Sequence, residues 1–397
     1  MSPWIALVVP IFGALIMLIF FSRKALWWEL LVPIGATALI ILIFKFAVTT
    51  GLTSATEYRG SIIVKARYTE YYETYVSRTC TRTVSCGKNC TTTETYDCSY
   101  CDENSAHWDA WDAYGNKYRI SQEKYNRLMQ QWGAQQQFVN LHRDIDYSGG
   151  CGKDGNAYDI SWNGDPNTAD AAVFTHEYKN RPQAAKSAFH YEPISDKHAQ
   201  QLGLWKYPEQ FDYYRQTCIL GLDSITSSNE LNRIKRKFEY FDGYYGQHKH
   251  IKLFVLLFYN KPLSIVHKQE AYWTGGNDNE LVVCIGMDKK TGELQWTQAF
   301  SWCFDKRVAI DCREDIMNDK VFNSDSVYNA IERTVVQNFK PRNLDSDFSY
   351  LEVDIPEWAI IVTFILAILT TACTSYWAVT NEFDYDHLSG NYRSSRW

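Results

Sequence analysis

Residues 251–259 read Ile-Lys-Leu-Phe-Val-Leu-Leu-Phe-Tyr, and this nearly continuous apolar run decides the fold of a large part of the chain. The run has the length of a strand, and apolar residues at almost every position are typical of a strand covered on both faces. Residues 281–287 and 294–302 flank the turn Asp288-Lys-Lys-Thr-Gly292 and predict a hairpin. We therefore predict an α+β subdomain over residues 246–340, with a sheet partly covered by helices.

Amphipathic patterns predict two helices next to this sheet. A capping box at Ser227–Glu230 precedes apolar residues at helical spacing and predicts a helix over residues 228–241, which ends before Gly243. Residues 326–339 show the same spacing and predict a second helix. The first helix closes a mixed connecting region over residues 161–245. Weaker signals in that region predict a strand near Val173–Tyr178 and a short helix over Ser195–Leu202.

Residues 51–160 form a region rich in cysteine and in residues that favour strands. Alternating apolar and polar residues predict a strand over residues 57–80, which leads into the first cysteines. Aromatic residues around the turn at Gly115 predict a hairpin over residues 107–120. A capping serine and a terminating glycine predict a short helix over Ser121–Trp132.

Three apolar segments are long enough to be transmembrane helices. Residues 4–21 contain no charge, and at about 1.5 Å per residue they nearly cross the roughly 30 Å hydrocarbon layer. Residues 30–49 are interrupted only by Lys45 near their end, where a lysine side chain reaches the interface. Residues 358–379 have tryptophan and tyrosine at their ends, as at membrane interfaces. We therefore predict an α+β membrane protein with a transmembrane helical hairpin over residues 1–50 and one C-terminal transmembrane helix.

Basic residues indicate the orientation of the chain. Arginine and lysine lie in the short loop 22–29, and arginines lie in the tail 380–397. The positive-inside rule therefore places the loop and the tail in the cytoplasm. Residues 51–355 form a large extracytoplasmic ectodomain, which ends in a linker over residues 341–357. Both ends of this ectodomain are then fixed to one membrane surface, which favours lateral partners.

The cysteines agree with an oxidising compartment. Ten of the eleven cysteines lie in the predicted ectodomain, and an even number suits disulfides that brace it. The spacing of the first cysteines also fits four thiolates around a structural zinc, and both interpretations stay open. Candidates for disulfides or zinc are Cys80, Cys86, Cys90, Cys98, Cys101 and Cys151, and further disulfide candidates are Cys218, Cys284, Cys303 and Cys312.

The acidic loop over residues 142–159 is a candidate metal site. Its carboxylates could bind calcium through oxygen ligands, although the twelfth position from Asp144 is Gly155, so the loop is not an EF-hand. A solvated acidic loop explains the same residues. With His142, this loop is the basis of our alternative function, a metal-dependent envelope hydrolase. The metal candidates are Asp144, Asp146, Asp154 and Asp159.

Two groups of aromatic residues are candidate contact surfaces. Trp108 and Trp111 lie in the predicted hairpin, and Tyr272 and Trp273 precede a glycine pair. Exposed tryptophan and tyrosine supply much of the energy of protein interfaces, whereas core packing is the competing interpretation. The basic run at residues 233–237 lies on an amphipathic helix, which favours a solvated face over a site for an anionic partner.

Five stretches carry a family resemblance, namely Tyr96–Cys101, Lys252–Tyr259, Tyr272–Gly276, Glu280–Gly286 and Phe300–Cys303. They resemble an uncharacterised membrane-protein family of bacterial and bacteriophage genomes, which implies a membrane-tethered ectodomain and no assigned activity. Residues 275–286 and the hairpin after them also resemble the TPM family, whose α/β ectodomains are tethered by membrane helices and serve as accessory or assembly factors. The acidic metal-binding positions of that family are not clearly matched here.

These observations predict a membrane-tethered, non-catalytic binding or assembly module at the cell envelope or a virus-associated membrane. We expect membrane lipid and another membrane or extracytoplasmic protein as partners, and a homo-oligomer fits the same arrangement. The net charge of -6 and the lack of a basic tail argue against a general nucleic-acid binder. We expect no cofactor, with structural zinc and calcium as the open alternatives.

Overall fold

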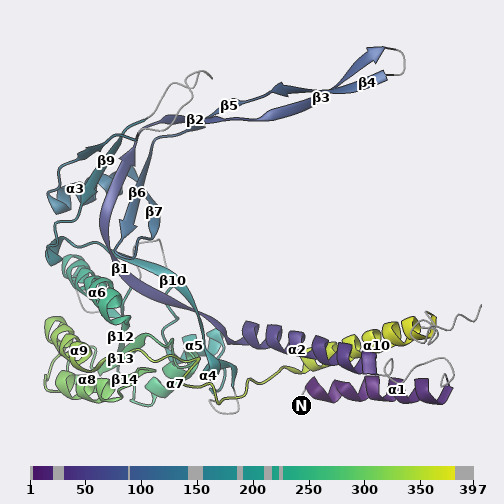
Figure 1. Cartoon of the computed structure of the whole chain (residues 1–397). Coiled ribbons are helices and arrows are strands. Elements are labelled where there is room, and N and C mark those ends of the chain that lie inside the picture. The colour runs from purple at the N-terminus through teal and green to yellow at the C-terminus, as the bar shows by residue number, and fades with distance from the viewer. Residues whose placement is uncertain are drawn as a thin grey trace, which may run out of the picture. The chain divides into compact units, whose positions relative to one another are not determined.

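We describe the chain from a computed structural model, which defines residues 3–20, 31–87, 90–141, 155–185, 191–209, 217–222 and 227–380 (Figure 1). The chain divides into two compact units. The first, here called the helical unit, consists of residues 1–55, 177–191 and 343–397. The second, here called the mixed unit, consists of residues 56–176 and 192–342.

Three long apolar helices dominate the helical unit. A 3-10 helix at Pro3–Leu7 continues into α1 (Val8–Phe20), α2 spans Leu31–Thr53 and α10 spans Glu357–Thr380. All three segments are long and apolar enough to cross a membrane, as the sequence predicts. Helix α2 runs past the predicted end at residue 49. The hydroxyl of Thr53 donates to the carbonyl of Thr49 (2.9 Å), which satisfies a backbone acceptor in the last turn.

Small and hydroxyl-bearing residues let these helices pack closely. Thr363 and Thr371 of α10 each donate a hydrogen bond to the carbonyl four residues earlier (both 2.7 Å). A Cβ added to Gly13 would lie 2.4 Å from the methyl group of Thr371, so α1 and α10 approach each other at this glycine. Close contact at small residues is how transmembrane helices associate without a hydrophobic driving force between them.

The segment before α10 is held by hydrogen bonds to a short helix, α4 (Arg181–Ala184). Arg181 Nε donates to Asp345 Oδ1 (2.6 Å), and the amide of Asp354 donates to the carbonyl of Ala184 (3.1 Å). The residues predicted as a linker are therefore tied to the rest of the helical unit through both side-chain and backbone contacts.

A four-stranded sheet forms the core of the mixed unit. Its strand order is β11 (Ile219–Leu220), β12 (Lys252–Tyr259), β13 (Glu280–Met287) and β14 (Leu294–Ser301). Strand β12 pairs in parallel with β11 and β13, and β14 runs antiparallel to β13. Every residue of β12 except the last is buried, which confirms the predicted central strand and the hairpin beside it.

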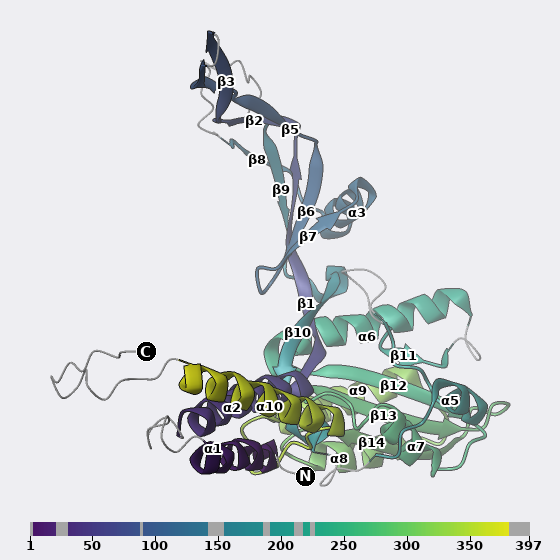
Figure 2. The same cartoon turned by 90° about the vertical axis from the view of Figure 1, so that its right-hand side faces the viewer.

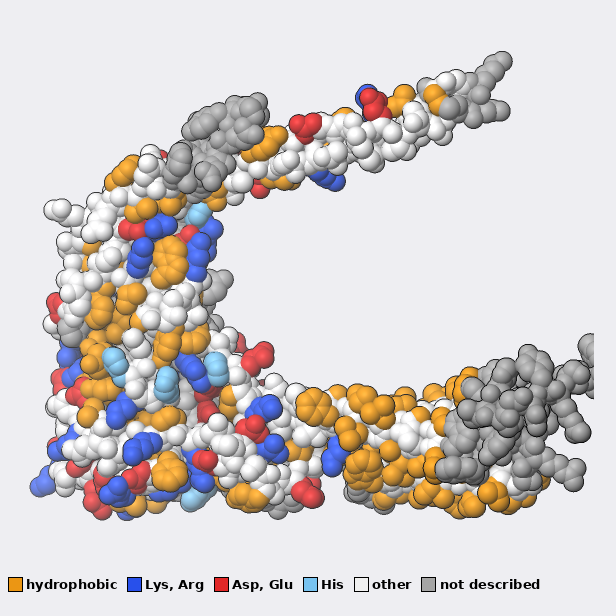
Figure 3. All heavy atoms as spheres, in the orientation of Figure 1, with side chains coloured by type: hydrophobic (Ala, Val, Ile, Leu, Met, Phe, Trp, Pro, Cys, Tyr) orange, Lys and Arg blue, Asp and Glu red, His pale blue; other side chains and the backbone are white. Residues whose placement is uncertain are grey.

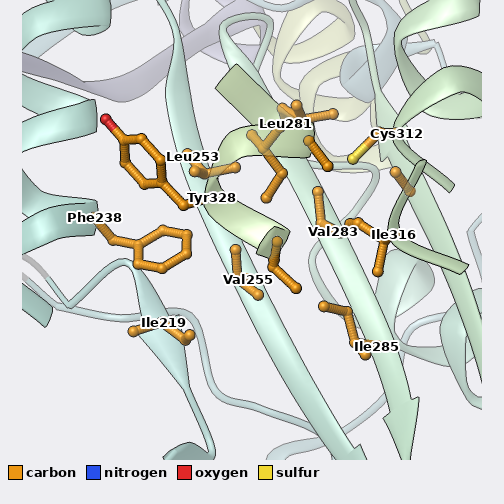
Figure 4. Close-up of a cluster of buried hydrophobic side chains, with 14 of the residues drawn as sticks. Ile219, Phe238, Leu253, Val255, Leu281, Val283, Ile285, Cys312, Ile316 and Tyr328 are labelled. Carbon is orange, nitrogen blue, oxygen red and sulfur yellow. The ribbon is translucent and has the colours of Figure 1, made fainter. Parts of the chain in front are cut away.

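Helices cover both faces of this sheet. Leu253 and Val255 point to the face covered by α6 (Ser228–Lys249), α8 (Arg307–Met317) and α9 (Ser324–Asn338) (Figure 4). Phe254 and Leu256 point to the opposite face, covered by α5 (Asp196–Leu202) and α7 (Ile265–Tyr272). Each fully buried side chain of this size stabilises the fold by about 1.5–3 kcal/mol, so this double-sided core anchors the mixed unit.

Helix α6 runs through Gly243 to Lys249, so the predicted end before Gly243 is wrong. The glycine instead allows contact with a neighbouring strand. An added Cβ on Gly243 would lie 2.8 Å from the carbonyl oxygen of Ser61, and one on Gly246 would lie 2.9 Å from Gly60 Cα. Glycine often terminates helices, but here its missing side chain lets the helix lie directly against the backbone of a strand.

A second sheet has the strand order β7 (Lys117–Ile120), β6 (His107–Asp112), β1 (Ser54–Thr69), β9 (Ala157–Ser161) and β8 (Gln137–Val139), and β10 (Ala171–Lys179) also pairs with β1. Helix α3 (Gln122–Trp132) packs on one face of it (Figure 2). The hydroxyl of Ser121 accepts from the amide of Lys124 (3.1 Å), and Gly133 ends the helix in a left-handed conformation (φ 58°). The predicted hairpin and helix are confirmed.

Residues 72–104 form two narrow ladders, here called the arm (Figure 1). Strand β2 (Tyr72–Val76) pairs with β5 (Tyr100–Asn104), and β3 (Thr79–Gly87) pairs with β4 (Cys90–Asp97). The single strand predicted over residues 57–80 is therefore three strands. Cys80 and Cys98 form a disulfide that joins the arm's outer ladder at its base, with a Cα–Cα distance of 5.8 Å. Cys86 and Cys101 are also disulfide-bonded, so none of these four sulfurs is a thiolate ready for zinc.

The disulfides predicted for the four later cysteines are not formed, because all four residues are free and buried. Cys284 lies on the α7 face of the sheet, whereas the other three lie in the core of the opposite face, so the sheet separates Cys284 from the other three. Burial raises the pKa of Cys312 to about 12 and that of Cys284 further. These thiols are packing residues. The four are Cys218, Cys284, Cys303 and Cys312.

Candidate functional site

The face of the second sheet opposite α3 carries rows of charged side chains. Asp109 on β6 pairs with Arg119 on β7 and with Arg67 on β1. Arg67 pairs in turn with Asp159 on β9. In the next row, Trp111 lies between Lys117 and Lys65. We call this surface the charged face, and it comprises Lys65, Arg67, Asp109, Trp111, Lys117, Arg119 and Asp159.

Alternation along the strands separates these residues from the core. Successive side chains of a strand point to opposite faces, and Ala66 and Ala110, which lie between the charged residues, pack in the core beneath α3. The charged residues therefore occupy the other face. In the space-filling view, basic side chains gather on this sheet around a hydrophobic one (Figure 3).

Buried carboxylates hold the cations in place. Asp109 is 2% exposed and contacts Lys117 Nζ (2.9 Å) and Arg119 Nε (3.2 Å). Asp159 accepts two hydrogen bonds from the Arg67 guanidinium (2.6 and 2.8 Å) and contacts Lys65 Nζ (2.8 Å). Burial raises the pKa of Asp159, but the bonds from Arg67 and Lys65 outweigh burial and lower it below the usual range. Asp159 is therefore a carboxylate near neutral pH.

Trp111 is the centre of this arrangement. The cationic groups of Lys65, Arg67 and Lys117 lie 5.7, 5.7 and 5.6 Å from the centroid of its ring. A cation at such a distance is attracted by the ring's quadrupole, with about 0.5–1 kcal/mol at exposed sites. The four basic side chains outnumber the two carboxylates and lie outside them, since the side chains of Lys117 and Arg119 are 53% and 59% exposed. The exposed part of the charged face is therefore basic and aromatic.

A polar cleft of about 550 Å³ lies next to this surface, where the arm joins the sheet. Lys117, Arg119 and His107 line it together with Tyr72 and Asn104. His107 Nε2 lies 3.4 Å from Asp109 Oδ2, so the imidazole belongs to the same charge network. The charged face thus continues into a polar hollow.

The predicted aromatic contact residues divide between surface and core. Trp108 points away from the charged face and stacks on Tyr68 at 5.1 Å. The Tyr272 hydroxyl donates to Asp196 (2.9 Å), and Trp273 is 6% exposed and donates from its ring nitrogen to the carbonyl of Trp205 (2.8 Å). Core packing, the competing interpretation, is therefore correct for Trp273, and the prediction of a contact surface there is wrong.

The acidic loop lies largely outside the described residues, which include neither His142 nor Asp144, Asp146 and Asp154. Asp159 is described, and its two oxygens are occupied by Arg67 and Lys65. In the described part of the chain, no group of three or more histidine, cysteine or acidic side chains has the geometry of a metal site. Asp159 therefore acts as an anchor for basic residues in this structure.

A buried ionic cluster lies at the start of β12, where the sequence shows one lysine within an apolar run. Lys252 is 0% exposed and is bonded to the Asp242 carboxylate, which also accepts from the amide of Leu253 (2.7 Å) and from the thiol of Cys218 (2.7 Å). Burial and the neighbouring carboxylate raise the pKa of Cys218 well above its usual range. The sulfur therefore stays a thiol, and the cluster has a structural role without a nucleophile.

A second buried cluster surrounds Glu57 of β1. Its carboxylate contacts Arg59 Nε (2.6 Å) and His176 Nδ1 (3.0 Å), and it is hydrogen-bonded to Asp278. Burial, with Glu57 beside it, raises the pKa of Asp278 to about 9. Asp278 is therefore protonated at neutral pH and can donate its proton to Glu57.

No protein-family model, curated protein or solved structure matches the chain. The family resemblances of the sequence therefore stay predictions.

Proposed function

We propose that the chain is a membrane-tethered, non-catalytic module that binds or assembles with another membrane or extracytoplasmic protein. In this proposal α1, α2 and α10 span the membrane, and the mixed unit is extracytoplasmic. The observation that carries the proposal is Trp111 with three cations around its ring and buried carboxylates behind them.

The arm supports the extracytoplasmic side. The disulfide between Cys80 and Cys98 is typical of proteins that fold in oxidising compartments. The two basic segments of the sequence, in the loop 22–29 and the tail 380–397, favour the same orientation.

The charged face suits binding because its cations are already ordered. Fixing a long side chain at an interface costs about 0.5–1.5 kcal/mol, and the ion pairs of Arg67 and Lys117 meet part of this cost before a partner arrives. Tryptophan and arginine are also the residues that dominate interface energy. The expected partner surface presents carboxylates around an apolar or aromatic centre, complementary to this face.

Site-specific photocrosslinking tests the proposal in native membranes. Ser161 is exposed and lies next to Lys65 in the row of Trp111, so p-benzoylphenylalanine at this position reports contacts of the charged face without removing a charge. The matched control places the same crosslinker at Lys289, exposed in the turn between β13 and β14. We expect a discrete protein adduct from position 161, none from position 289, and loss of the adduct with Trp111→Ala or Lys117→Glu. An adduct that persists in both variants, or equal labelling at the two positions, would contradict the proposal.

A further inference from the structure

A second cleft of the mixed unit lies between α3 and α6 and has a volume of about 700 Å³. Ligand sites for small molecules have volumes of this order, enough for one or two sugar rings. The 3-10 turn at Pro166–Thr168 and the start of β10 complete its wall. Its residues are distinct from those of the charged face.

Polar side chains from two helices face this cleft. On α6, Asn229, Asn232, Arg236 and Tyr240 recur at helical spacing and form one stripe. On α3, Arg127 lines the cleft, one turn before Gln131. Four basic and two acidic side chains line the cleft, so its charge is positive.

Most charges of this lining are already satisfied. Asp170 is bonded to the buried ammonium of Lys124, and Lys237 Nζ contacts Asp325 (2.6 Å). Arg233 is paired with Glu230 (2.7 Å) and also contacts Asp325 (3.2 Å). These side chains are therefore held by the protein itself and form the rim of the site.

Arg127 and Arg236 differ from the other cations. Both are exposed, and neither forms a hydrogen bond or an ion pair with any residue that the structure describes. The same is true of the side chains of Asn229 and Asn232. Two guanidinium groups and two amides thus converge on one cleft from two helices, without partners of their own.

We propose that this cleft binds an acidic carbohydrate, with its carboxylate or phosphate held by Arg127 and Arg236 and its hydroxyls by Asn229 and Asn232. Guanidinium groups bind carboxylate and phosphate through paired hydrogen bonds, and amides both donate to and accept from hydroxyls. The ring of Tyr240 supplies an apolar surface for the C–H face of a sugar. The anionic group matches the two arginines, and the sugar ring matches the two asparagines and Tyr240. A bare anion would contact the arginines and leave the asparagines and Tyr240 without a ligand.

Calorimetric titration of the full chain in detergent tests this with four probes: glucuronate, glucose 6-phosphate, glucose and inorganic phosphate. We expect at least one of the acidic sugars to bind at least tenfold more tightly than both glucose and inorganic phosphate. Binding of glucuronate alone would identify a carboxylated ligand, and binding of glucose 6-phosphate alone a phosphorylated one. Inorganic phosphate binding as tightly as the acidic sugars would overturn the proposal, as would no binding up to about 10 mM, where even weak sites of millimolar affinity are occupied.

Variants locate the site. The double variant Arg127→Gln/Arg236→Gln removes two exposed, unpaired charges, so it should fold normally and weaken binding by tenfold or more. Arg313→Gln, an exposed arginine on α8, is the matched control and should bind like the unmodified chain. Unchanged binding in the double variant would also overturn the proposal. If the unmodified chain, the double variant and Arg313→Gln have equal melting temperatures, a loss of binding comes from the changed side chains and not from unfolding.

Discussion

The carboxyl groups of Asp278 and Glu57 are hydrogen-bonded to each other inside the mixed unit, and one proton is held between them. Two carboxylates so close cannot both ionise without strong repulsion. Glu57 also contacts Arg59 Nε (2.6 Å) and His176 Nδ1 (3.0 Å), whereas burial beside Glu57 raises the pKa of Asp278. The proton therefore stays on Asp278, whose pKa is about 9.

The first prediction is that Asp278→Asn flattens the pH dependence of stability. Between about pH 4 and pH 9 the folded chain keeps a proton on Asp278 that the unfolded chain releases. The free energy of unfolding therefore falls as pH rises through this window, by up to about 1.4 kcal/mol per pH unit. Asparagine donates to Glu57 without titrating. Thermal melting from pH 5 to 9 should show a flatter profile for this variant, whereas Asp102→Asn, at an exposed position, should keep the original slope.

The second prediction concerns the buried pair of Lys252 and Asp242. Lys252→Met fills the same space but leaves Asp242 as an unpaired buried charge, which should cost about 3–5 kcal/mol of stability. Adding Asp242→Asn removes that charge and should recover a large part of the loss. Denaturant titrations of both variants measure the difference, with Lys289→Met as the surface control. A double variant no more stable than Lys252→Met would contradict this account.

The third prediction tests the contact between α6 and β1. A Cβ on Gly60 would lie 2.0 Å from the carbonyl oxygen of Asp242, so Gly60→Ala must displace backbone. We expect the free energy of unfolding to fall by about 1–3 kcal/mol or more, as is typical of overpacked cores. Gly51→Ala is the control, because nothing lies within 4 Å of an added Cβ there. Equal melting temperatures for the two variants would contradict this prediction, because they would show that α6 and β1 can move apart without loss of stability.

The fourth prediction concerns the state of the cysteines. Cys80 and Cys98 should react with maleimide only after reduction, because they form a disulfide. Cys284 and Cys312 should react without a reductant once the chain is denatured, because they are free but buried. Peptide mapping after acid trapping of thiols in cells separates the two groups. Reduced Cys80 and Cys98 in that sample would argue against an oxidising compartment for the arm.

Local signals in the sequence predict much of the fold. The apolar run at residues 251–259, the cap at Ser121 and the glycine at Gly133 each act within a few residues, and the structure confirms all three. The extension of α6 past Gly243 was not predictable in this way, since it depends on contact with Ser61, far away in the chain. Local sequence patterns carry no information about contacts between residues that are far apart in the chain.

The sequence predicts only part of the candidate site. It indicates Trp111 as an aromatic residue in a hairpin, whereas the surroundings of Trp111 depend on Lys65 and Lys117 on two neighbouring strands. Alternating charges at positions 65 and 67 and at 117 and 119 were a usable signal, but their common face depends on strand pairing. For Trp273, composition alone could not separate a core aromatic from an exposed one.

The rows of the charged face also determine how β1 aligns with its neighbours during folding. A slip of one residue between β1 and β6 would turn every side chain of β1 to the other side of the sheet. Lys65 and Arg67 would then lie beneath α3 without carboxylates, while Ala66 and Tyr68 would face water. Misaligned pairings therefore carry a heavy desolvation penalty, and the residues offered to a partner also select a single alignment of the sheet.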